Sequence, residues 1–304
     1  QVARMLADDR SITLASDFLL QWLDMRRLDE IVPDGSVYPY ASGRSDPRDE
    51  FLTELTLFGD SIFREDRSVV DLLSADHTYL NERLALHYGI TDVKGARFRR
   101  VRLEESPRWG LLGKGAVLLR TSYGDRTSPV LRGAWVLERI VGATPPQPPP
   151  EVVTDLSVKE GEPATTVRAR LERHREDPTC NGCHGLIDPP GLALENFDVT
   201  GQWRDEDTLA NAPIDASTTL SSGIAIDGPI ELHSWDRQEV EVEVVDVERD
   251  VDLGPQRGDG SVHPAGVVQL FRPDELDVPR RAGDLDLLGA DAPQADAHDG
   301  NPID

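Results

Sequence analysis

The sequence predicts a mainly α-helical chain, with a helical module at its start, a small module near its middle and an irregular or disordered tail. Three observations lead to this prediction. Apolar residues recur at three- and four-residue steps through much of the first part of the chain. A proline run at 144–150 predicts an extended spacer. The residues after 234 are rich in Asp, Val, Arg, Gly and Pro and contain no lysine.

Four segments follow from these observations. They are a helical module at 1–143, a proline-rich spacer at 144–162, a small module at 163–234 and an acidic tail at 235–304.

The helices of the first module are predicted from local patterns. Apolar positions give one amphipathic helix over 12–31 and a second over 47–64, with Pro47 suited to the first turn. Shorter helices are expected over 68–73 and over 78–88, the latter with Thr78 as its N-cap.

The rest of the first module mixes a strand with glycines and a further helix. Alternation over 98–103 predicts a strand. The glycines between 110 and 115 do not have the spacing of a phosphate-binding loop, so we expect them to allow close packing of backbones. Ser128 and Pro129 begin a predicted helix that runs to 141.

Charge and hydropathy restrict the possible partners. The 304 residues carry a formal net charge of −24, which disfavours nucleic acid and anionic lipid surfaces and permits basic protein partners. No apolar run is long enough to span a membrane. Because the chain begins at Gln1 within a helical pattern, we expect it to be part of a longer protein whose targeting signal lies elsewhere.

The chemistry of the chain is concentrated in one short motif. Its only two cysteines, Cys180 and Cys183, are followed directly by His184 after a charged helix predicted over 164–176. The pattern C-x-x-C-H is typical of covalent c-type haem attachment. Two thiols add to the porphyrin, and the histidine becomes the proximal iron ligand, with its other ring nitrogen donating to a carbonyl or a carboxylate.

Other interpretations of the cysteine pair stay open. A local disulfide or inert thiols would suit an exported protein. A zinc site would need a distant fourth ligand in addition to Cys180, Cys183 and His184. A thioredoxin-like pair would need a βαβ context, for which the sequence gives no pattern.

The residues after the motif predict a rigid turn and an apolar wall. Pro189, Pro190 and Gly191 have turn-forming chemistry. Leu192 and the apolar residues at 194 and 197 are candidates to line the haem.

The sixth iron ligand has three candidates, none of which the sequence singles out. His174 lies on the helix before the motif and is otherwise expected to be a solvated surface residue. Met25 suits an apolar helix as core filler. His87 ends a predicted helix, where a capping role is the alternative.

Several segments together resemble the multi-domain planctomycete-type cytochrome c proteins of unknown function. The segments are Asp66-Arg67-Ser68-Val69-Val70-Asp71-Leu72-Leu73, Tyr79-Leu80-Asn81-Glu82-Arg83-Leu84-Ala85, Arg126-Thr127-Ser128-Pro129-Val130-Leu131-Arg132-Gly133, Pro178-Thr179-Cys180-Asn181-Gly182-Cys183-His184, Asp188-Pro189-Pro190-Gly191-Leu192-Ala193-Leu194-Glu195-Asn196-Phe197-Asp198 and Gly201-Gln202-Trp203-Arg204. The resemblance covers roughly residues 10–232. It implies that the small module is cytochrome-c-like, that the helical module is its usual upstream neighbour, and that the protein is exported.

Two departures from the family accompany this resemblance. His77 stands where an aromatic residue is expected. The C-terminal helical domain of the family should begin near 226–232, but the sequence after 235 does not continue it, and we hypothesise that this tail is a frameshifted translation.

Two functions of different classes follow. The first is a c-type cytochrome module that holds haem c and transfers single electrons with a redox partner protein outside the cytoplasm, periplasmic or at the cell surface. We expect such a module rather than a stand-alone enzyme, and no catalytic residue is predicted. The alternative is a non-redox structural or carbohydrate-associated scaffold in which Cys180 and Cys183 form a disulfide or are idle.

Overall fold

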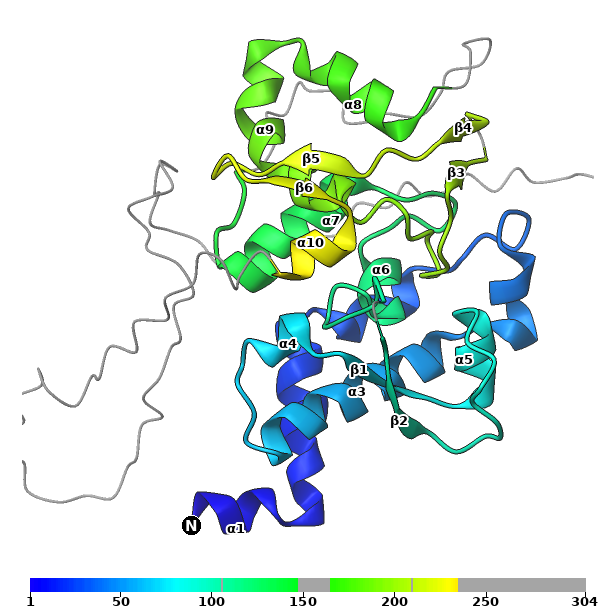
Figure 1. The fold of residues 1–304 in the computed structure, drawn as a ribbon, viewed down its shortest axis with the longest axis vertical. Helices are drawn as coiled ribbons and strands as arrows, with labels where there is room; N and C mark the ends of the chain where they lie inside the picture. Colours follow the sequence, from blue (N-terminus) through cyan, green and yellow to red (C-terminus); the bar gives the residue numbers. More distant parts are fainter. Residues whose placement is uncertain (105, 147–164, 209, 235–304) are drawn as a thin grey trace, which may run out of the picture. The chain divides into compact units, whose positions relative to one another are not determined.

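A computed structural model describes residues 1–104, 106–146, 165–208 and 210–234. Helices dominate this part of the chain, which confirms the mainly α-helical prediction (Figure 1). The predictions of a spacer beyond residue 146, of a disordered tail and of a frameshift fall outside the described residues.

The N-terminal helical region is broken where the sequence predicts one helix over 12–31. It consists of short pieces: α1 (Val2–Leu6), 3₁₀ turns at Asp9–Ser11 and Met25–Glu30, a π-helical turn at Leu14–Leu19, and α2 (Leu20–Trp22).

The break lies at Asp24, whose φ of 59° is left-handed. Leu23 and Met25, on either side of it, are both buried, whereas residues two apart on a continuous helix face different directions. The freed carbonyl of Leu23 accepts from the Trp135 indole at 3.1 Å, and that of Asp24 accepts from Arg120 at 3.1 Å.

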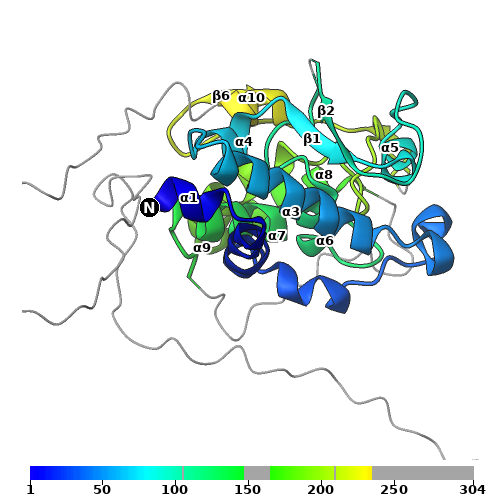
Figure 2. The ribbon, with the colours of Figure 1, turned by 90° about the horizontal axis from the view of Figure 1, so that it is seen from below.

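The helix α3 (Arg48–Arg64) is the centre of the first part of the fold, as the apolar spacing predicts. Phe51, Leu55, Phe58 and Ile62 are buried along one face. This face contacts the π-helical turn, α6 and the strand β1, and Figure 2 shows α3 between the strands and α6.

A strand takes the place of the predicted helix start at Thr78. β1 (His77–Leu80) pairs antiparallel with β2 (Arg99–Arg102), and β2 confirms the strand predicted there. The helix begins later, as α5 (Glu82–His87). Its N-cap is Asn81, whose side chain accepts a backbone N–H of the first turn at 2.8 Å, so the predicted cap at Thr78 is wrong.

The second half of the described chain is again helical. α6 (Gly115–Arg120) is followed by α7 (Pro129–Trp135), which continues as a π-helical turn through Val141 and is capped by Ser128 as predicted. The charged helix is α8 (Val167–Arg175), and the cysteine motif lies on α9 (Pro178–Leu192).

The remaining elements are short. They are α4 (Asp71–Ser74), the antiparallel pairs β3 (Glu206–Asp207) with β4 (Ala212–Pro213) and β5 (Ser217–Thr219) with β6 (Ala225–Asp227), α10 (Pro229–Ser234), and 3₁₀ turns at Pro39–Ala41 and Gly43–Ser45.

The glycines near residue 110 allow close backbone packing, as predicted. A Cβ added at Gly110 would lie 2.0 Å from the carbonyl oxygen of Leu73. One at Gly115 would lie 2.3 Å from the Phe51 ring. Neither position can accept a side chain without a shift of its neighbours.

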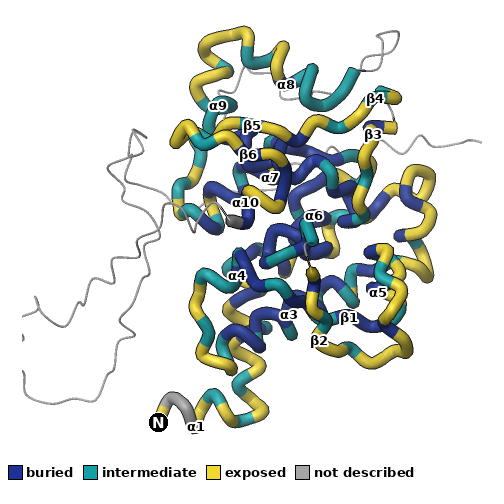
Figure 3. Tube along the Cα trace, viewed as in Figure 1, coloured by how far each residue is buried: buried dark blue, intermediate teal, exposed yellow. Residues whose placement is uncertain are grey.

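One hydrophobic core includes residues from both predicted modules. Phe51 and Leu118 from the first module belong to the same buried cluster as Leu194 and Phe197 from the second. In Figure 3 the buried colour runs continuously from α3 through α6 to α7. The positions of the domain boundaries stay a prediction.

Candidate functional site at the cysteine pair

The N-terminal half of α9 carries the motif in a partly exposed position. Asp177 caps the helix by accepting from the backbone N–H of Thr179 at 2.8 Å. Cys180, Cys183 and His184 are all partly exposed. The two cysteines are three positions apart on a helix, so they share a face, and both are free thiols.

Space is available next to the motif. Asn181 and Gly182, between the cysteines, are exposed, and a Cβ added at Gly182 would have no atom within 4 Å. A group attached through the two sulfurs would therefore meet solvent rather than packed protein at this point.

A buried carboxylate holds His184. The Nδ1 atom lies 2.9 Å from Oδ1 of Asp188, one helical turn later, and the Asp188 side chain is 0% exposed. An ionised carboxylate only accepts hydrogen bonds, so the ring proton belongs on Nδ1 and the Nε2 lone pair is left available. The donor that the sequence assigns to iron thus has the orientation that such a ligand requires.

Within the part of the chain that the structure describes, the second oxygen of Asp188 has no hydrogen-bond partner. Its nearest charged neighbour is Arg175 at the end of α8, whose Nε lies 3.8 Å away. The side chain of Arg175 is 23% exposed, so this guanidinium retains part of its hydration.

Among the three candidates for the sixth ligand, His174 is the one next to His184. The two ring centroids are 4.7 Å apart and the rings are nearly perpendicular at 81°. His174 is therefore half-buried against the motif and not the solvated surface residue of the alternative interpretation.

The other two candidates lie in the first part of the fold. Met25 is 2% exposed and packs in the hydrophobic core. His87 does not cap its own helix, because its Nε2 is 2.8 Å from the carbonyl oxygen of Thr200. Burial lowers the pKa of His87, which keeps the ring neutral and able to donate to that carbonyl.

The predicted turn and apolar wall are both wrong. Pro189, Pro190 and Gly191 are within the last turns of α9. Leu192 is 1% exposed, and the apolar residues at 194 and 197 belong to the main core, so they do not line an open pocket. The reason is that the C-terminal half of α9 packs closely on α7 (Figure 1).

Two glycines make this close packing possible. A Cβ on Gly133 of α7 would lie 1.7 Å from the carbonyl oxygen of Ile187, and one on Gly191 of α9 would lie 1.8 Å from that of Pro129. The two backbones therefore touch, and the contact fixes the helix that carries the motif.

A fully buried arginine fixes the chain after α9. The guanidinium of Arg132 donates to the carbonyl oxygens of Leu194, Phe197 and Asp198 at 2.6, 2.9 and 3.0 Å. Its side chain is 0% exposed, and this burial lowers its pKa to about 10. Sequence reasoning missed this role, for which the only signal was a charged residue on the apolar helix 128–141.

Two family models match the chain. The first 90 residues match PSD4, described as a protein of unknown function (DUF1592). Residues 108–207 match PSCyt3, likewise described as a protein of unknown function (DUF1588), and this segment contains α6 to α9 and the cysteine motif. The chain combines a PSD4 domain with a PSCyt3 domain. These are the planctomycete cytochrome-c-associated domains of unknown function, in the order that the resemblance implies.

The PSCyt3 segment runs across residue 143, where the sequence predicts the end of the first module. No curated protein and no solved structure matches the chain. Across the residues that the structure describes, no helix is long and apolar enough to cross a membrane.

The PSCyt3 residues fit a covalently attached haem in their donor chemistry. Cys180 and Cys183 are accessible thiols on one helix face, and His184 has a carboxylate on Nδ1 and a free Nε2. Within the described ranges, no group of three or more His, Cys, Asp or Glu side chains suited to a metal ion occurs. The fourth ligand of the zinc interpretation is not seen among them.

A buried polar centre that sequence reasoning also missed contains residues of both the PSD4 segment and the PSCyt3 segment. Glu54 is 1% exposed and accepts from the hydroxyls of Thr78 and Tyr88, the latter at 2.7 Å. Lys114 is 0% exposed, with its Nζ 4.4 Å from the Phe58 ring centroid. Burial raises the pKa of Glu54 and lowers that of Lys114 to about 8.

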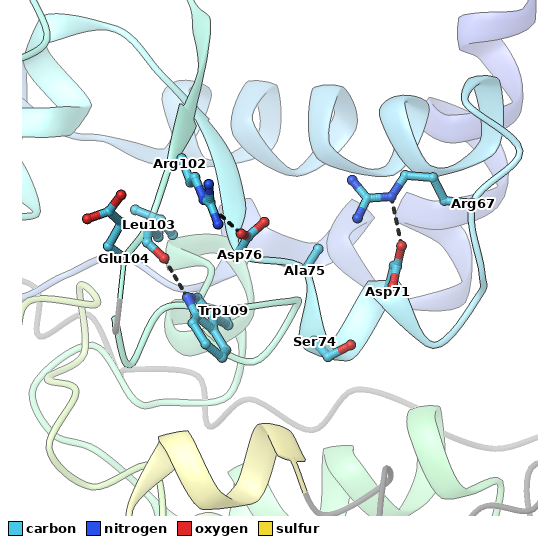
Figure 4. A pocket seen from close by; sticks show the side chains of 9 residues that line it. All are labelled: Arg67, Asp71, Ser74, Ala75, Asp76, Arg102, Leu103, Glu104 and Trp109. Atoms are coloured by element: carbon cyan, nitrogen blue, oxygen red, sulfur yellow. Dashed lines mark hydrogen bonds and ion pairs between the residues drawn. The ribbon is translucent and has the colours of Figure 1, made fainter.

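A pocket of about 700 Å³ opens beside α4 (Figure 4). Four of its charged groups are paired, with Arg67 2.7 Å from Asp71 and Arg102 3.0 Å from Asp76. The indole of Trp109 donates to a backbone carbonyl at 2.7 Å. These contacts account for most of the polar lining without a ligand.

Proposed function

We propose that this chain is a c-type cytochrome module that holds haem covalently and transfers single electrons. Cys180 and Cys183 form the two thioether links, and His184 is the proximal iron ligand. The observation that carries the proposal is the 2.9 Å contact between His184 and the buried Asp188, which leaves Nε2 free. A histidine that only faces solvent has no need of a buried carboxylate, whose desolvation is costly.

The attached haem would supply an iron that gains or loses one electron. The protein contributes the rest. Contacts of Gly133 and Gly191 hold α9 against α7, and the exposed N-terminal half of α9 presents the motif to the surface. A redox partner protein would reach the group at this half of the helix. The acidic balance of the chain favours a partner with a basic surface.

Haem c chemistry also supports a location outside the cytoplasm, periplasmic or at the cell surface. If the chain were instead a non-redox scaffold at that location, Cys180 and Cys183 would form a disulfide or remain as unused thiols. The carboxylate contact of His184 favours the cytochrome module, because a scaffold does not require it.

The decisive measurement is whether the protein carries covalently bound haem. The chain is expressed together with c-type haem maturation machinery, and a denaturing gel is stained for haem peroxidase activity. We expect a stained band for the parent and none for Cys180→Ala/Cys183→Ala. The exposed Gly182→Ala variant is the matched control, since it alters the motif without removing a donor.

A parent protein without covalent haem would overturn the proposal. In that case a thiol titration with and without reductant distinguishes a disulfide from idle cysteines. A pyridine haemochrome spectrum of the stained protein identifies two thioether links.

A further inference from the structure

The contact between Asp188 and His184 can affect more than the orientation of the imidazole ring. We propose that Asp188 and Arg175 are a pair of positioning residues that sets the reduction potential of iron held by His184. Asp188 lowers the potential, and Arg175 partly offsets this lowering. This inference rests on the proposed haem attachment.

The first argument is the isolation of the Asp188 charge. The side chain is 0% exposed, its Oδ1 contacts His184 at 2.9 Å, and its Oδ2 has no hydrogen bond. With no other donor on it, the negative charge acts mainly on the imidazole Nδ1–H. In surroundings shielded from water such a bond is electrostatically strong.

The second argument is the direction of the effect. A carboxylate that accepts from Nδ1–H raises the basicity of the ring, so Nε2 donates more strongly to a bound metal. Stronger donation and a nearby negative charge both stabilise the ferric state relative to the ferrous state, because the ferric state carries one more positive charge. Removal of the Asp188 charge should therefore raise the potential.

The third argument concerns α8. Arg175 approaches Oδ2 at 3.8 Å without forming a hydrogen bond, so it offsets the carboxylate charge only in part. The position of Arg175 depends on α8, which is anchored by the fully buried Leu171 and capped by Thr166. The packing of α8 on α9 therefore fixes the distance between Arg175 and Asp188, and with it the electrostatic potential at His184.

Neighbouring residues provide matched controls. Glu176 is exposed and carries the same charge as Asp188, and Arg173 is exposed and carries the same charge as Arg175. Neither control residue contacts His184 or Asp188 in the described structure. Their variants measure the general effect of one charge at the motif.

The test is a redox titration of the haem-loaded chain and its variants. We expect Asp188→Asn to shift the potential upward by more than Glu176→Gln, and Arg175→Met to shift it downward by more than Arg173→Met. In the parent, the Nδ1–H proton should give a slowly exchanging NMR signal that is altered in Asp188→Asn and unchanged in Glu176→Gln.

Shifts no larger than those of the matched controls overturn the inference. If Asp188→Asn does not fold, the pair Arg175→Met and Arg173→Met decides the question alone. Absence of covalent haem from the parent is a different result, which overturns the proposed function before the titration begins.

Discussion

Glu54 and Asp188 are two carboxylates buried to the same degree, but their partners differ. Glu54 accepts from Thr78 and Tyr88, which are themselves buried, and the buried cations Lys114 and Arg108 act on its charge. Asp188 contacts His184, whose side chain is 20% exposed. The first carboxylate is satisfied entirely inside the protein, whereas the second connects the interior to a group at the surface.

The difference separates a structural role from a functional one. A buried charge is tolerated when neighbouring groups replace its lost hydration. Around Glu54 these groups come from β1, the end of α5 and the chain at 108–114, and they hold these segments together. Around Asp188 they are few, and the main one is His184, the proposed iron ligand, at a partly exposed position.

Alanine in place of each carboxylate tests this contrast directly. Glu54→Ala leaves Lys114 and Arg108 buried without their carboxylate, so we expect a loss of about 3–5 kcal/mol in the free energy of unfolding. Asp188→Ala should cost only about 1–2 kcal/mol in the haem-free protein, because His184 can still be hydrated.

Urea denaturation measures both values. Asp49→Ala, an exposed acidic position in the first turn of α3, is the control and should cost no more than about 1 kcal/mol. Equal losses for Glu54→Ala and Asp188→Ala would end the distinction between the two sites.

A second contrast concerns the pH dependence of stability, because the interior also contains buried histidines. His233 is 1% exposed, neither ring nitrogen has a hydrogen-bond partner among the described residues, and burial lowers its pKa from 6.5 to about 3. Between these values the unfolded chain binds more protons than the folded chain, so stability rises with pH and falls as the solution is acidified.

Acidification from pH 6.5 to pH 4 should therefore remove up to about 3 kcal/mol through His233. Thermal unfolding over this range is the measurement. In His233→Leu the pH dependence should become flatter, although that through His77 remains, because burial lowers the pKa of His77 to about 4. An unchanged pH dependence of thermal unfolding in His233→Leu would show that His233 is not shielded from water in solution.

The smallest expected effect compares the two halves of α9. Gly191→Ala places a methyl group 1.8 Å from the carbonyl oxygen of Pro129, and we expect a loss of about 1–3 kcal/mol. Gly182→Ala in the open half has no atom within 4 Å, so it should be neutral or stabilise by up to about 1 kcal/mol. Calorimetric unfolding of the two variants compares them, and similar melting temperatures would contradict the difference in packing.

Local patterns in the sequence predicted several elements correctly. The apolar spacing of α3, the alternation predicted over 98–103 and the Ser128 cap each depend on residues close together in the chain. The three donors Cys180, Cys183 and His184 are adjacent as well, so the candidate site could be located before the fold was known.

Long-range contacts decided what those patterns could not. The break at Asp24 lets two consecutive apolar segments reach one core, and β1 replaces a helix start because β2 is available to pair with it. Arg132 is buried because three carbonyl oxygens more than 60 residues away accept hydrogen bonds from its guanidinium. The sequence by itself therefore determined the apolar period of α3, the Ser128 cap and the haem-type motif, which depend on near neighbours. Only the tertiary structure decided which half of α9 is buried, since that depends on how closely α7 approaches it.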